Sequence, residues 1–230
     1  MITGAGSGIG QKTALFLAGE GTRVCCADLF GEKALETAEL VHEQGGEAIS
    51  VQCDVRDYGQ VERMVKETVG TFAQLDILVN SAGAAAGGLF ADTEPKDWTN
   101  ELEINLLGTM NCCRAAIERM MPRNYGKIVN LASDAGRVGE KRMTVYGAAK
   151  GGVLGFTKCL SVEMARHKIN VNAISPGVVR SPMTSYLTDE MAEQWARMYP
   201  LRRLGETEDV ANMIVFLCSD RTSWVTGQTI

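Results

Sequence analysis

Short apolar runs alternate with longer helix-forming stretches along this chain, and this alternation is the feature that most restricts its fold. The apolar runs lie at residues 1–3, 23–27, 48–52, 75–79 and 127–131. The helix-forming stretches lie at residues 8–20, 32–44, 61–72, 96–121 and 145–166. Strands that alternate with helices predict a parallel sheet with helices on both faces. We therefore expect an α/β protein with three layers and a doubly wound parallel sheet.

The length and composition suit a single domain, residues 1–230. A chain of 230 residues buries about 70% or more of its unfolded surface, so its core needs no disulfide or metal for stability. No linker, low-complexity segment or internal repeat interrupts the sequence, and proline is sparse. A second domain is not expected.

Charge and hydropathy exclude several classes of partner. The formal net charge is -5 and the Lys and Arg residues are dispersed, which argues against nucleic-acid binding. No apolar run is long enough to span a membrane, and no charged-then-apolar leader precedes the fold. We expect a cytoplasmic protein that binds a small molecule and neither nucleic acid nor membrane.

The cysteines do not have the spacing of a metal site. All seven lie outside any Cys-x-x-Cys motif, and only His42 and His167 are present as histidine ligands. No metal is expected. An odd number of cysteines in apolar surroundings indicates buried thiols in a reducing compartment.

A glycine-rich segment follows the first apolar run. It reads Gly4-Ala5-Gly6-Ser7-Gly8-Ile9-Gly10 and leads into the helix-forming stretch 8–20. Glycines at such a position let the backbone approach a pyrophosphate, whose charge is met by the amide groups and the positive end of the helix. Taken alone, the segment is also compatible with a tight turn that binds nothing.

Asp28 ends the second apolar run and strengthens the nucleotide hypothesis. A carboxylate at this distance from the glycines accepts hydrogen bonds from the adenosine ribose hydroxyls and repels a 2′-phosphate. Neither Ser7 nor Leu29 supplies the positive charge that a phosphate needs. The sequence therefore favours NAD over NADP, and the alternative role for Asp28 is a helix N-cap.

Polar or small residues stand where the predicted strands end. In open parallel sheets, ligands bind outside the carboxyl ends of the strands. We expect those ends to converge on one crevice, and they carry Gly4, Asp28, Asp54, Asn80, Ser133 and Ser175.

Ser133, Tyr146 and Lys150 form the candidate reactive group. Tyr146 and Lys150 are four residues apart, so on a helix over 145–166 they share one face. The ammonium beside the phenol favours the phenolate, and we expect it to lower the pKa of Tyr146 toward working pH. Ser133 follows the run 127–131, and its hydroxyl can donate to a substrate oxygen held by Tyr146. By itself the Tyr–Lys spacing also fits a half-exposed tyrosine covered by a lysine stem.

These motifs together resemble the single-domain short-chain dehydrogenases/reductases, which have a Rossmann fold. The resemblance covers essentially the whole chain. It is carried by Thr3-Gly4-x-x-x-Gly8-x-Gly10, Asp28, Asp54-Val55, Asn80-Ser81-Ala82-Gly83, Asn105, Ser133, Tyr146-x-x-x-Lys150 and Pro176-Gly177. Residues 1–130 are then expected mainly to bind the dinucleotide, and residues 131–230 to supply the catalytic residues and a substrate lid.

The resemblance implies a role for each matching residue. Tyr146 would move the proton, Ser133 would orient the reacting oxygen, and Lys150 would lower the tyrosine pKa and hold the nicotinamide ribose. Asn105 would kink a long helix and support a water next to Lys150. The implied NAD site comprises Gly4, Ser7, Gly8, Ile9, Gly10, Asp28, Leu29, Asp54, Val55, Asn80, Ala82, Gly83, Tyr146, Lys150, Pro176, Gly177 and Ser181.

The sequence departs from the family pattern at a few points. Ser81 stands where a second asparagine is usual, which puts a structural hydrogen bond in doubt, whereas Ser181 keeps the hydroxyl of the usual threonine. The chain begins inside the first strand and reaches Ile230 where the last strand is expected to begin. The first and last strands should therefore be short.

The substrate site is read from less constrained positions. The segment 84–88 lacks large side chains and leaves one wall open. The apolar residues Leu187, Met191, Trp195, Met198 and Tyr199 fit one stripe of a helical lid or an ordinary helix packed on the core. The loop 134–144 resembles that of hydroxyacyl-CoA dehydrogenases and 3-oxoacyl-carrier-protein reductases. Its cations Arg137, Lys141 and Arg142 fit either the phosphates of coenzyme A or a carrier protein, or an ordinary solvated loop. The candidate substrate residues are Asp134, Arg137, Arg142, Tyr186 and Leu187.

We therefore expect an NAD-dependent oxidoreductase that interconverts a secondary alcohol and a ketone, with a coenzyme A or carrier-protein thioester as the favoured substrate. A free cyclic alcohol, sugar or steroid is the alternative substrate. A non-catalytic dinucleotide-sensing protein is the alternative from another class. The resemblance also implies a homotetramer or homodimer, in which small residues on two long helices, Cys112, Cys113, Ala115, Ala116, Gly151, Gly152 and Gly155, permit close helix contact.

Overall fold

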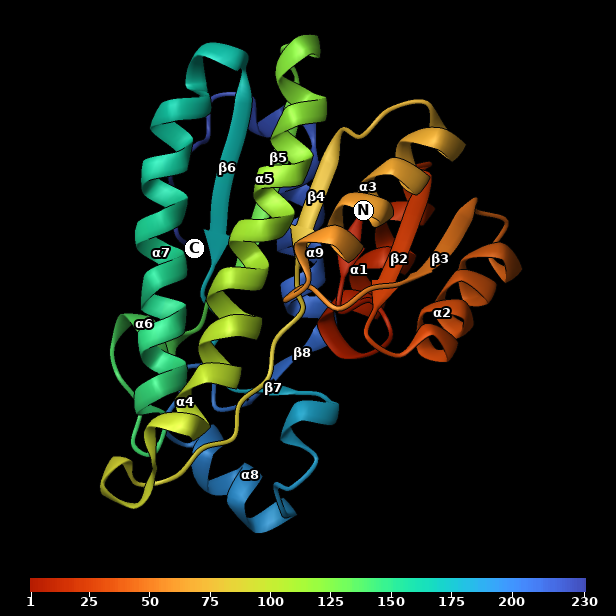
Figure 1. Ribbon diagram of the computed structural model, residues 1–230. Coiled ribbons are helices and arrows are strands. Elements are labelled where there is room, and N and C mark those ends of the chain that lie inside the picture. The colour runs from red at the N-terminus through yellow and green to blue at the C-terminus, as the bar shows by residue number, and fades with distance from the viewer.

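A six-stranded parallel sheet forms the centre of the computed structural model, which describes residues 1–230 (Figure 1). The strand order is β3-β2-β1-β4-β5-β6. All neighbours are parallel, and Ile2 of β1 pairs with both Cys26 and Val79. The strands are β1 (Ile2–Thr3), β2 (Val24–Asp28), β3 (Ala48–Gln52), β4 (Ile77–Asn80), β5 (Gly126–Leu131) and β6 (Ile169–Ile174). The predicted doubly wound sheet is confirmed, because the order reverses direction between β1 and β4.

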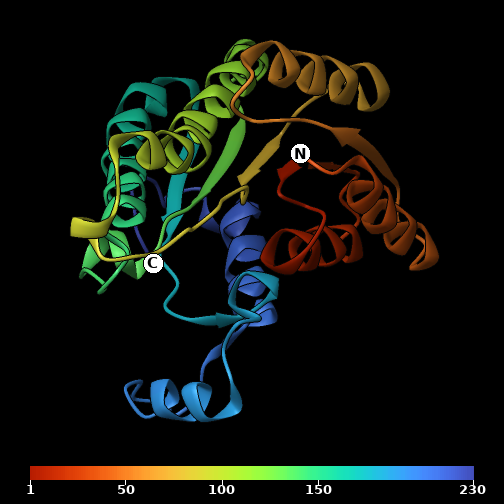
Figure 2. The ribbon, with the colours of Figure 1, turned by 60° about the horizontal axis from the view of Figure 1, so that its bottom comes forward.

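Helices cover both faces of the sheet, as the views in Figures 1 and 2 show. One face packs against α1 (Gly8–Gly19), α2 (Gly31–Glu43) and α9 (Thr207–Cys218), and the other against α3 (Tyr58–Phe72), α5 (Gly108–Met120) and α7 (Thr144–Met164). Successive strand residues point to opposite faces. Leu78 accordingly belongs to the core under α3 and α5, whereas Val79 belongs to the core under α1 and α9.

The expected long helix over 96–121 is interrupted. It consists of α4 (Pro95–Leu102), a π-helical turn (Glu103–Leu107) and α5. A π turn inserts an extra residue into the helical repeat and often marks a functional site. Here it contains Asn105, which is fully buried.

A small outlying unit lies at the carboxyl end of the sheet. The two-residue strands β7 (Val179–Arg180) and β8 (Gly205–Glu206) pair in parallel, and α8 (Asp189–Ala196) stands away from the main body (Figure 2). The expected lid helix is therefore short. Leu187 lies before this helix, and Met198 and Tyr199 lie beyond its end. The prediction that all five apolar residues share one helical stripe is therefore wrong, and Met198 is 70% exposed.

Short helical segments complete the chain. Part of the expected loop 134–144 is helical, as α6 (Asp134–Arg137). Single 3₁₀ turns are formed by Phe90–Asp92, Met121–Arg123, Ala165–His167, Pro182–Thr184 and Asp220–Thr222. Near the carboxyl end, Thr229 forms one parallel bridge to Ala173 beside β6.

Two expectations about small side chains need correction. Cys159 is exposed, because it lies on the outer side of α7, whereas the other six cysteines are buried. Cys112, Cys113, Ala115 and Ala116 are buried against the sheet of their own chain. These four residues therefore cannot provide the close helix contacts of an assembly.

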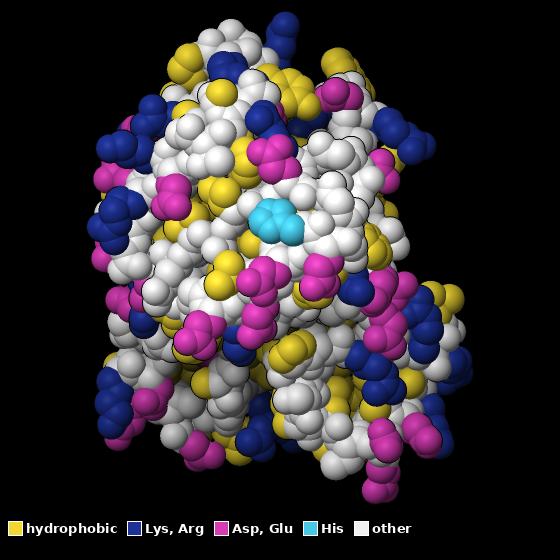
Figure 3. Space-filling view, turned by 90° about the vertical axis from the view of Figure 1, so that its right-hand side faces the viewer, with side chains coloured by type: hydrophobic (Ala, Val, Ile, Leu, Met, Phe, Trp, Pro, Cys, Tyr) yellow, Lys and Arg dark blue, Asp and Glu magenta, His cyan; other side chains and the backbone are white.

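The surface matches the dispersed charge of the sequence. On the face drawn in Figure 3, Lys and Arg side chains are interspersed with Asp and Glu side chains. None of the helices has both the length and the apolar character needed to cross a bilayer.

Candidate active site

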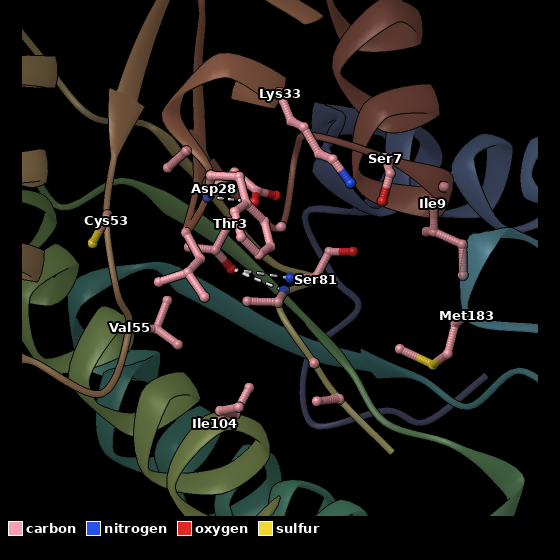
Figure 4. A pocket seen from close by; sticks show the side chains of 18 of the residues that line it. Thr3, Ser7, Ile9, Asp28, Lys33, Cys53, Val55, Ser81, Ile104 and Met183 are labelled. Atoms are coloured by element: carbon pink, nitrogen blue, oxygen red, sulfur yellow. Dashed lines mark hydrogen bonds between the residues drawn. The ribbon is translucent and has the colours of Figure 1, made fainter. Parts of the chain in front are cut away.

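A cavity of about 360 Å³ lies outside the carboxyl ends of β1 and β4, where the strand order reverses. Thr3 holds its floor together, because its Oγ1 accepts hydrogen bonds from the amides of Ser81 and Ala82, each at 3.2 Å (Figure 4). This contact uses the backbone of Ser81. The serine in place of a second asparagine therefore leaves this connection intact.

The glycine-rich turn forms one wall of this cavity and fits a pyrophosphate. Gly8, the first residue of α1, has a φ of +56° and lines the cavity. The first turn of α1 carries no acidic side chain, so its amide groups and positive end can meet an anion. Gly10 lies behind the wall, where a Cβ atom would be 2.1 Å from the Gly4 carbonyl oxygen.

Asp28 anchors the turn as well as lining the cavity. Its Oδ2 accepts a hydrogen bond from the Gly6 amide at 2.9 Å, and its Oδ1 accepts one from the Phe30 amide at 3.0 Å. Each carboxylate oxygen has a second lone pair for a further donor. The carboxylate therefore fits a ribose hydroxyl at the position expected from the sequence.

Two cations at this cavity were missed in the sequence. Lys33, on the first turn of α2, extends into the cavity toward Ser7 (Figure 4), with its Nζ 5.4 Å from the centre of the Phe30 ring. Arg56 binds the Asp54 carboxylate at 2.6 Å and lowers its pKa through that hydrogen bond. Both cations could have been found from the sequence, because Lys33 lies shortly after Asp28 and Arg56 lies shortly after Asp54.

A second cavity, of about 660 Å³, adjoins the first. Both are lined by Ile9, Ser81, Gly83, Ser181 and Met183. The second cavity brings together Ser133, Tyr146 and Lys150, as the sequence predicted, with Pro176 and Gly177 on the same wall.

Local structure fixes the three candidate catalytic residues. Ser133 follows β5 and is the N-cap of α6, where its Oγ accepts a hydrogen bond from the Ala135 amide at 3.2 Å. Tyr146 and Lys150 lie one turn apart on α7. The Lys150 Nζ donates to the Leu131 carbonyl at 2.7 Å and lies 5.6 Å from the centre of the Tyr146 ring.

The expected lowering of the Tyr146 pKa by Lys150 is wrong for the chain by itself. Burial of the phenol raises the pKa of Tyr146, Ser133 opposes this rise, and the charges of Glu140 and Glu101 add to it. Burial also lowers the pKa of Lys150 to about 8. Desolvation is the largest cause for both groups, because both lie in the protein interior.

Asn105 lies behind the cavity and holds one of its walls. Its Nδ2 donates to the Ala84 carbonyl at 2.7 Å, and its Oδ1 accepts from the Ala84 amide at 3.3 Å. A Cβ atom on Gly83 would lie 2.9 Å from Asn105 Oδ1 and 3.6 Å from Lys150 Nζ. Asn105 Oδ1 and Lys150 Nζ therefore both face the space that a side chain at residue 83 would occupy, and glycine leaves that space open.

Most expected cofactor residues line one of the two cavities, and two do not. Gly10 is internal to the turn, as described above. Asn80 is 3% exposed, and its Nδ2 donates to Asn130 Oδ1 at 2.8 Å. Its side chain belongs to the core, because it points into the sheet rather than out of its end. The residues that do line a cavity are Gly4, Ser7, Gly8, Ile9, Asp28, Leu29, Asp54, Val55, Ala82, Gly83, Tyr146, Lys150, Pro176, Gly177 and Ser181.

The substrate residues divide in a similar way. Arg142 and Tyr186 line the second cavity, together with Met143, Met183 and Trp195. Asp134, Arg137 and Leu187 do not. Arg137 turns back along α6 to pair with Asp134 at 3.4 Å, and Leu187 precedes α8 in a turn closed on Thr184. The second cavity therefore does not include these three candidate substrate residues.

Comparison with known proteins agrees with this architecture. A family model described as enoyl-(acyl carrier protein) reductase matches residues 4–230. The 3-oxoacyl-[acyl-carrier-protein] reductase FabG of Staphylococcus aureus strain Mu50 is 40% identical over 100% of this chain and 94% of its own length. The BbsD subunit of (2S)-[(R)-hydroxy(phenyl)methyl]succinyl-CoA dehydrogenase of Thauera aromatica is 36% identical over 100% of this chain and 92% of its own length. The crystal structure of a 3-oxoacyl-[acyl-carrier protein] reductase from Brucella melitensis superposes with a TM-score of 0.94 at 32% identity, covering 100% of this chain and 87% of that one.

The doubly wound sheet, the glycine turn and the clustered Ser, Tyr and Lys side chains define a dinucleotide-dependent oxidoreductase. The chain belongs to the short-chain dehydrogenase/reductase family. The family and fold predicted from the sequence are confirmed.

Proposed function

We propose that the protein is an NAD-dependent dehydrogenase/reductase that interconverts a hydroxyacyl and an oxoacyl thioester. The observation that carries the proposal is the shared cavity wall that joins Ser133, Tyr146 and Lys150 to the glycine-lined nucleotide cavity through Gly83 and Ser181. Residues 1–130 mainly form the nucleotide side. Residues 131–230 supply the acid/base residues and the outlying unit over the second cavity.

Each residue has a defined task in this proposal. Tyr146 gives a proton to the carbonyl oxygen in reduction and takes it from the hydroxyl in oxidation. Ser133 donates a hydrogen bond to the same oxygen. Lys150 supplies positive charge beside the phenol, against the burial that raises the pKa of Tyr146. Asn105 keeps the wall beside Lys150 in place. The nicotinamide, when bound, accepts or supplies the hydride.

Asp28 supports NAD as the cofactor. Its carboxylate lines the end of the nucleotide cavity and repels the second negative charge of a 2′-phosphate. Lys33 lies near enough to oppose this effect in part, so the preference for NAD is expected to be finite.

A thioester substrate is supported by the second cavity and by the relatives. Met143, Met183, Met191 and Trp195 give it an adaptable apolar lining, and Lys141 and Arg142 place cations at it. The named activities of the Staphylococcus and Thauera relatives concern carrier-protein and coenzyme A thioesters.

We also propose a cytoplasmic location and assembly as a homotetramer or homodimer. Exposed apolar side chains on the helices flanking the active site, such as Met110 and Val162, are available for subunit contacts. A light-scattering mass equal to one chain would contradict the assembly.

The function is tested by NADH formation from NAD and a 3-hydroxyacyl-CoA, with Tyr146→Phe as the control. A rate that falls at least a thousandfold in the control supports the proposal, within the roughly 10²–10⁴-fold range of acid/base catalysis. Absence of any rate with the thioester, together with turnover of a free cyclic alcohol, would reject the substrate. NADH binding without turnover of either substrate would favour a dinucleotide-sensing role.

A further inference from the structure

Glu101 is a buried carboxylate that the sequence motifs do not include. It lies on α4, four residues before Asn105, and is 7% exposed. None of the eight ion pairs in the protein includes it. Burying a carboxylate without a cation is costly, so its position calls for a specific function.

The carboxylate holds the wall of the substrate cavity. Its Oε1 accepts a hydrogen bond from the Ala86 amide at 2.6 Å, and Ala85 and Ala86 line the cavity that contains Tyr146. The segment 81–89 has no regular secondary structure. Side chains must therefore satisfy backbone groups that a strand would otherwise pair.

Glu101 and Asn105 act on this segment together. Asn105 Nδ2 donates both to the Ala84 carbonyl and, at 2.9 Å, to the Glu101 carbonyl. At the far end of the segment, Gly88 donates its amide to the Arg142 carbonyl at 2.8 Å. The wall is thus fixed at Ala84, Ala86 and Gly88. Ala84 is held by Asn105 of the π turn, and Ala86 is held by Glu101 of α4.

Glu101 also acts on Tyr146 through its charge. Burial raises the pKa of that tyrosine most, and the charges of Glu140 and, least, Glu101 add to the rise. The charged groups around the phenol come from three segments: Glu101 from α4, Glu140, Lys141 and Arg142 from the loop before α7, and Lys150 from α7.

We propose that Glu101 is a positioning residue of the active site: it clamps the cavity wall at Ala86, and its charge adds to the negative charge that faces Tyr146. The inference deepens the proposed function, on which it rests for its catalytic meaning. Two substitutions distinguish the hydrogen bond of Glu101 from its charge. A glutamine keeps an oxygen that accepts the Ala86 amide and loses the charge, whereas a leucine loses both.

The clamp is tested by hydrogen exchange of the Ala86 amide, which needs no substrate. Glu101→Leu is expected to speed this exchange about tenfold or more, as for loss of a hydrogen bond to a charged acceptor. Glu101→Gln is expected to keep most of the protection. An unchanged exchange rate in Glu101→Leu overturns the proposal.

The electrostatic part is tested by titrating Tyr146. The phenolate absorbance of each protein is compared with that of the same protein carrying Tyr146→Phe, so that the difference reports this tyrosine alone. Removal of the negative charge in Glu101→Gln is expected to lower the pKa of Tyr146. A titration curve that superimposes on that of the wild type overturns the proposal.

Glu103→Gln is the matched control for both measurements. Glu103 lies on the same helical rod, two residues further on, and its charge acts on Arg56. It should change neither the Ala86 exchange nor the Tyr146 titration. Because neither measurement uses turnover, a failure of the thioester assay and a failure of this inference give different results.

Discussion

The amino group of Lys150 lies 5.6 Å from the centre of the Tyr146 ring and donates a hydrogen bond to the Leu131 carbonyl at 2.7 Å. The lysine is 3% exposed, and burial lowers its pKa to about 8. In the folded protein Lys150 therefore loses its proton more readily than a lysine in water. This has a measurable effect on stability.

Between pH 8 and the ordinary lysine pKa of about 10.4, the unfolded chain binds more protons at this position than the folded chain does. The contribution of Lys150 to the free energy of unfolding consequently rises with pH in that window. Relative to Lys150→Met, the wild type should gain about 2 kcal/mol between pH 7 and pH 9.5, as measured by urea unfolding. The exposed Lys158 on the same helix provides the control. If the wild type gains as much stability relative to Lys158→Met as it does relative to Lys150→Met, the effect cannot be assigned to Lys150.

The cofactor preference should depend on two opposing side chains. Asp28→Ala is expected to lower the ratio of kcat/KM with NAD to kcat/KM with NADP by about tenfold or more. A single charge contact changes the difference in transition-state free energy between the two cofactors by about 1.4 kcal/mol or more, which is a tenfold change in this ratio. Lys33→Met should raise the same ratio, since it removes one of the two cations at this cavity, the one that lies near Asp28. If Asp28→Ala leaves the ratio unchanged, the argument for NAD fails.

Gly10 should tolerate no side chain. A Cβ atom there would lie 2.1 Å from the Gly4 carbonyl oxygen, a backbone atom of the same tight turn that cannot move aside as a flexible side chain could. Gly10→Ala is expected to lower the free energy of unfolding by about 1–3 kcal/mol, which corresponds to a fall in Tm of roughly 2–4 °C per kcal/mol. Gly19→Ala, on the same helix with nothing within 4 Å of the added atom, should leave Tm unchanged or raise it. Equal melting of wild type and Gly10→Ala would contradict the crowded turn.

The two arginines of the loop before α7 should differ in their effect on a thioester. Arg142 lines the cavity, whereas Arg137 pairs with Asp134 outside it. Arg142→Gln is expected to raise KM for a 3-hydroxyacyl-CoA about fivefold or more, the effect of losing a contact of about 1 kcal/mol to a phosphate. Arg137→Gln should leave KM within about twofold, because exposed pairs contribute little. The reverse order would exclude Arg142 as a phosphate contact.

Much of the fold and site was accessible from the sequence because it depends on local patterns. The alternation of strands and helices predicts the parallel sheet, and a parallel sheet places its strand ends at one edge. Asp28, Ser133, Tyr146 and Lys150 could be found for this reason. Spacing along one helix was enough to put Tyr146 and Lys150 on one face.

Other features depended on contacts between distant segments. Arg137 and Arg142 have the same charge and lie in one loop, and only the short helix α6 separates their roles. Asn80 stands at a strand end, yet its side chain bonds with Asn130 in the core. Glu101 showed no motif, because its partner, the Ala86 amide, is a backbone group that any residue carries.

The sequence by itself determined the layers, the strand ends and the identity of the acid/base residues, because these follow from periodicity and residue chemistry. The tertiary structure decided which side chains reach the cavities, how deeply they are buried and so which way their pKa values move. Burial cannot be read from spacing. It arises when segments far apart in the chain exclude water from the same volume, as α4, α7 and β5 do around Tyr146 and Lys150.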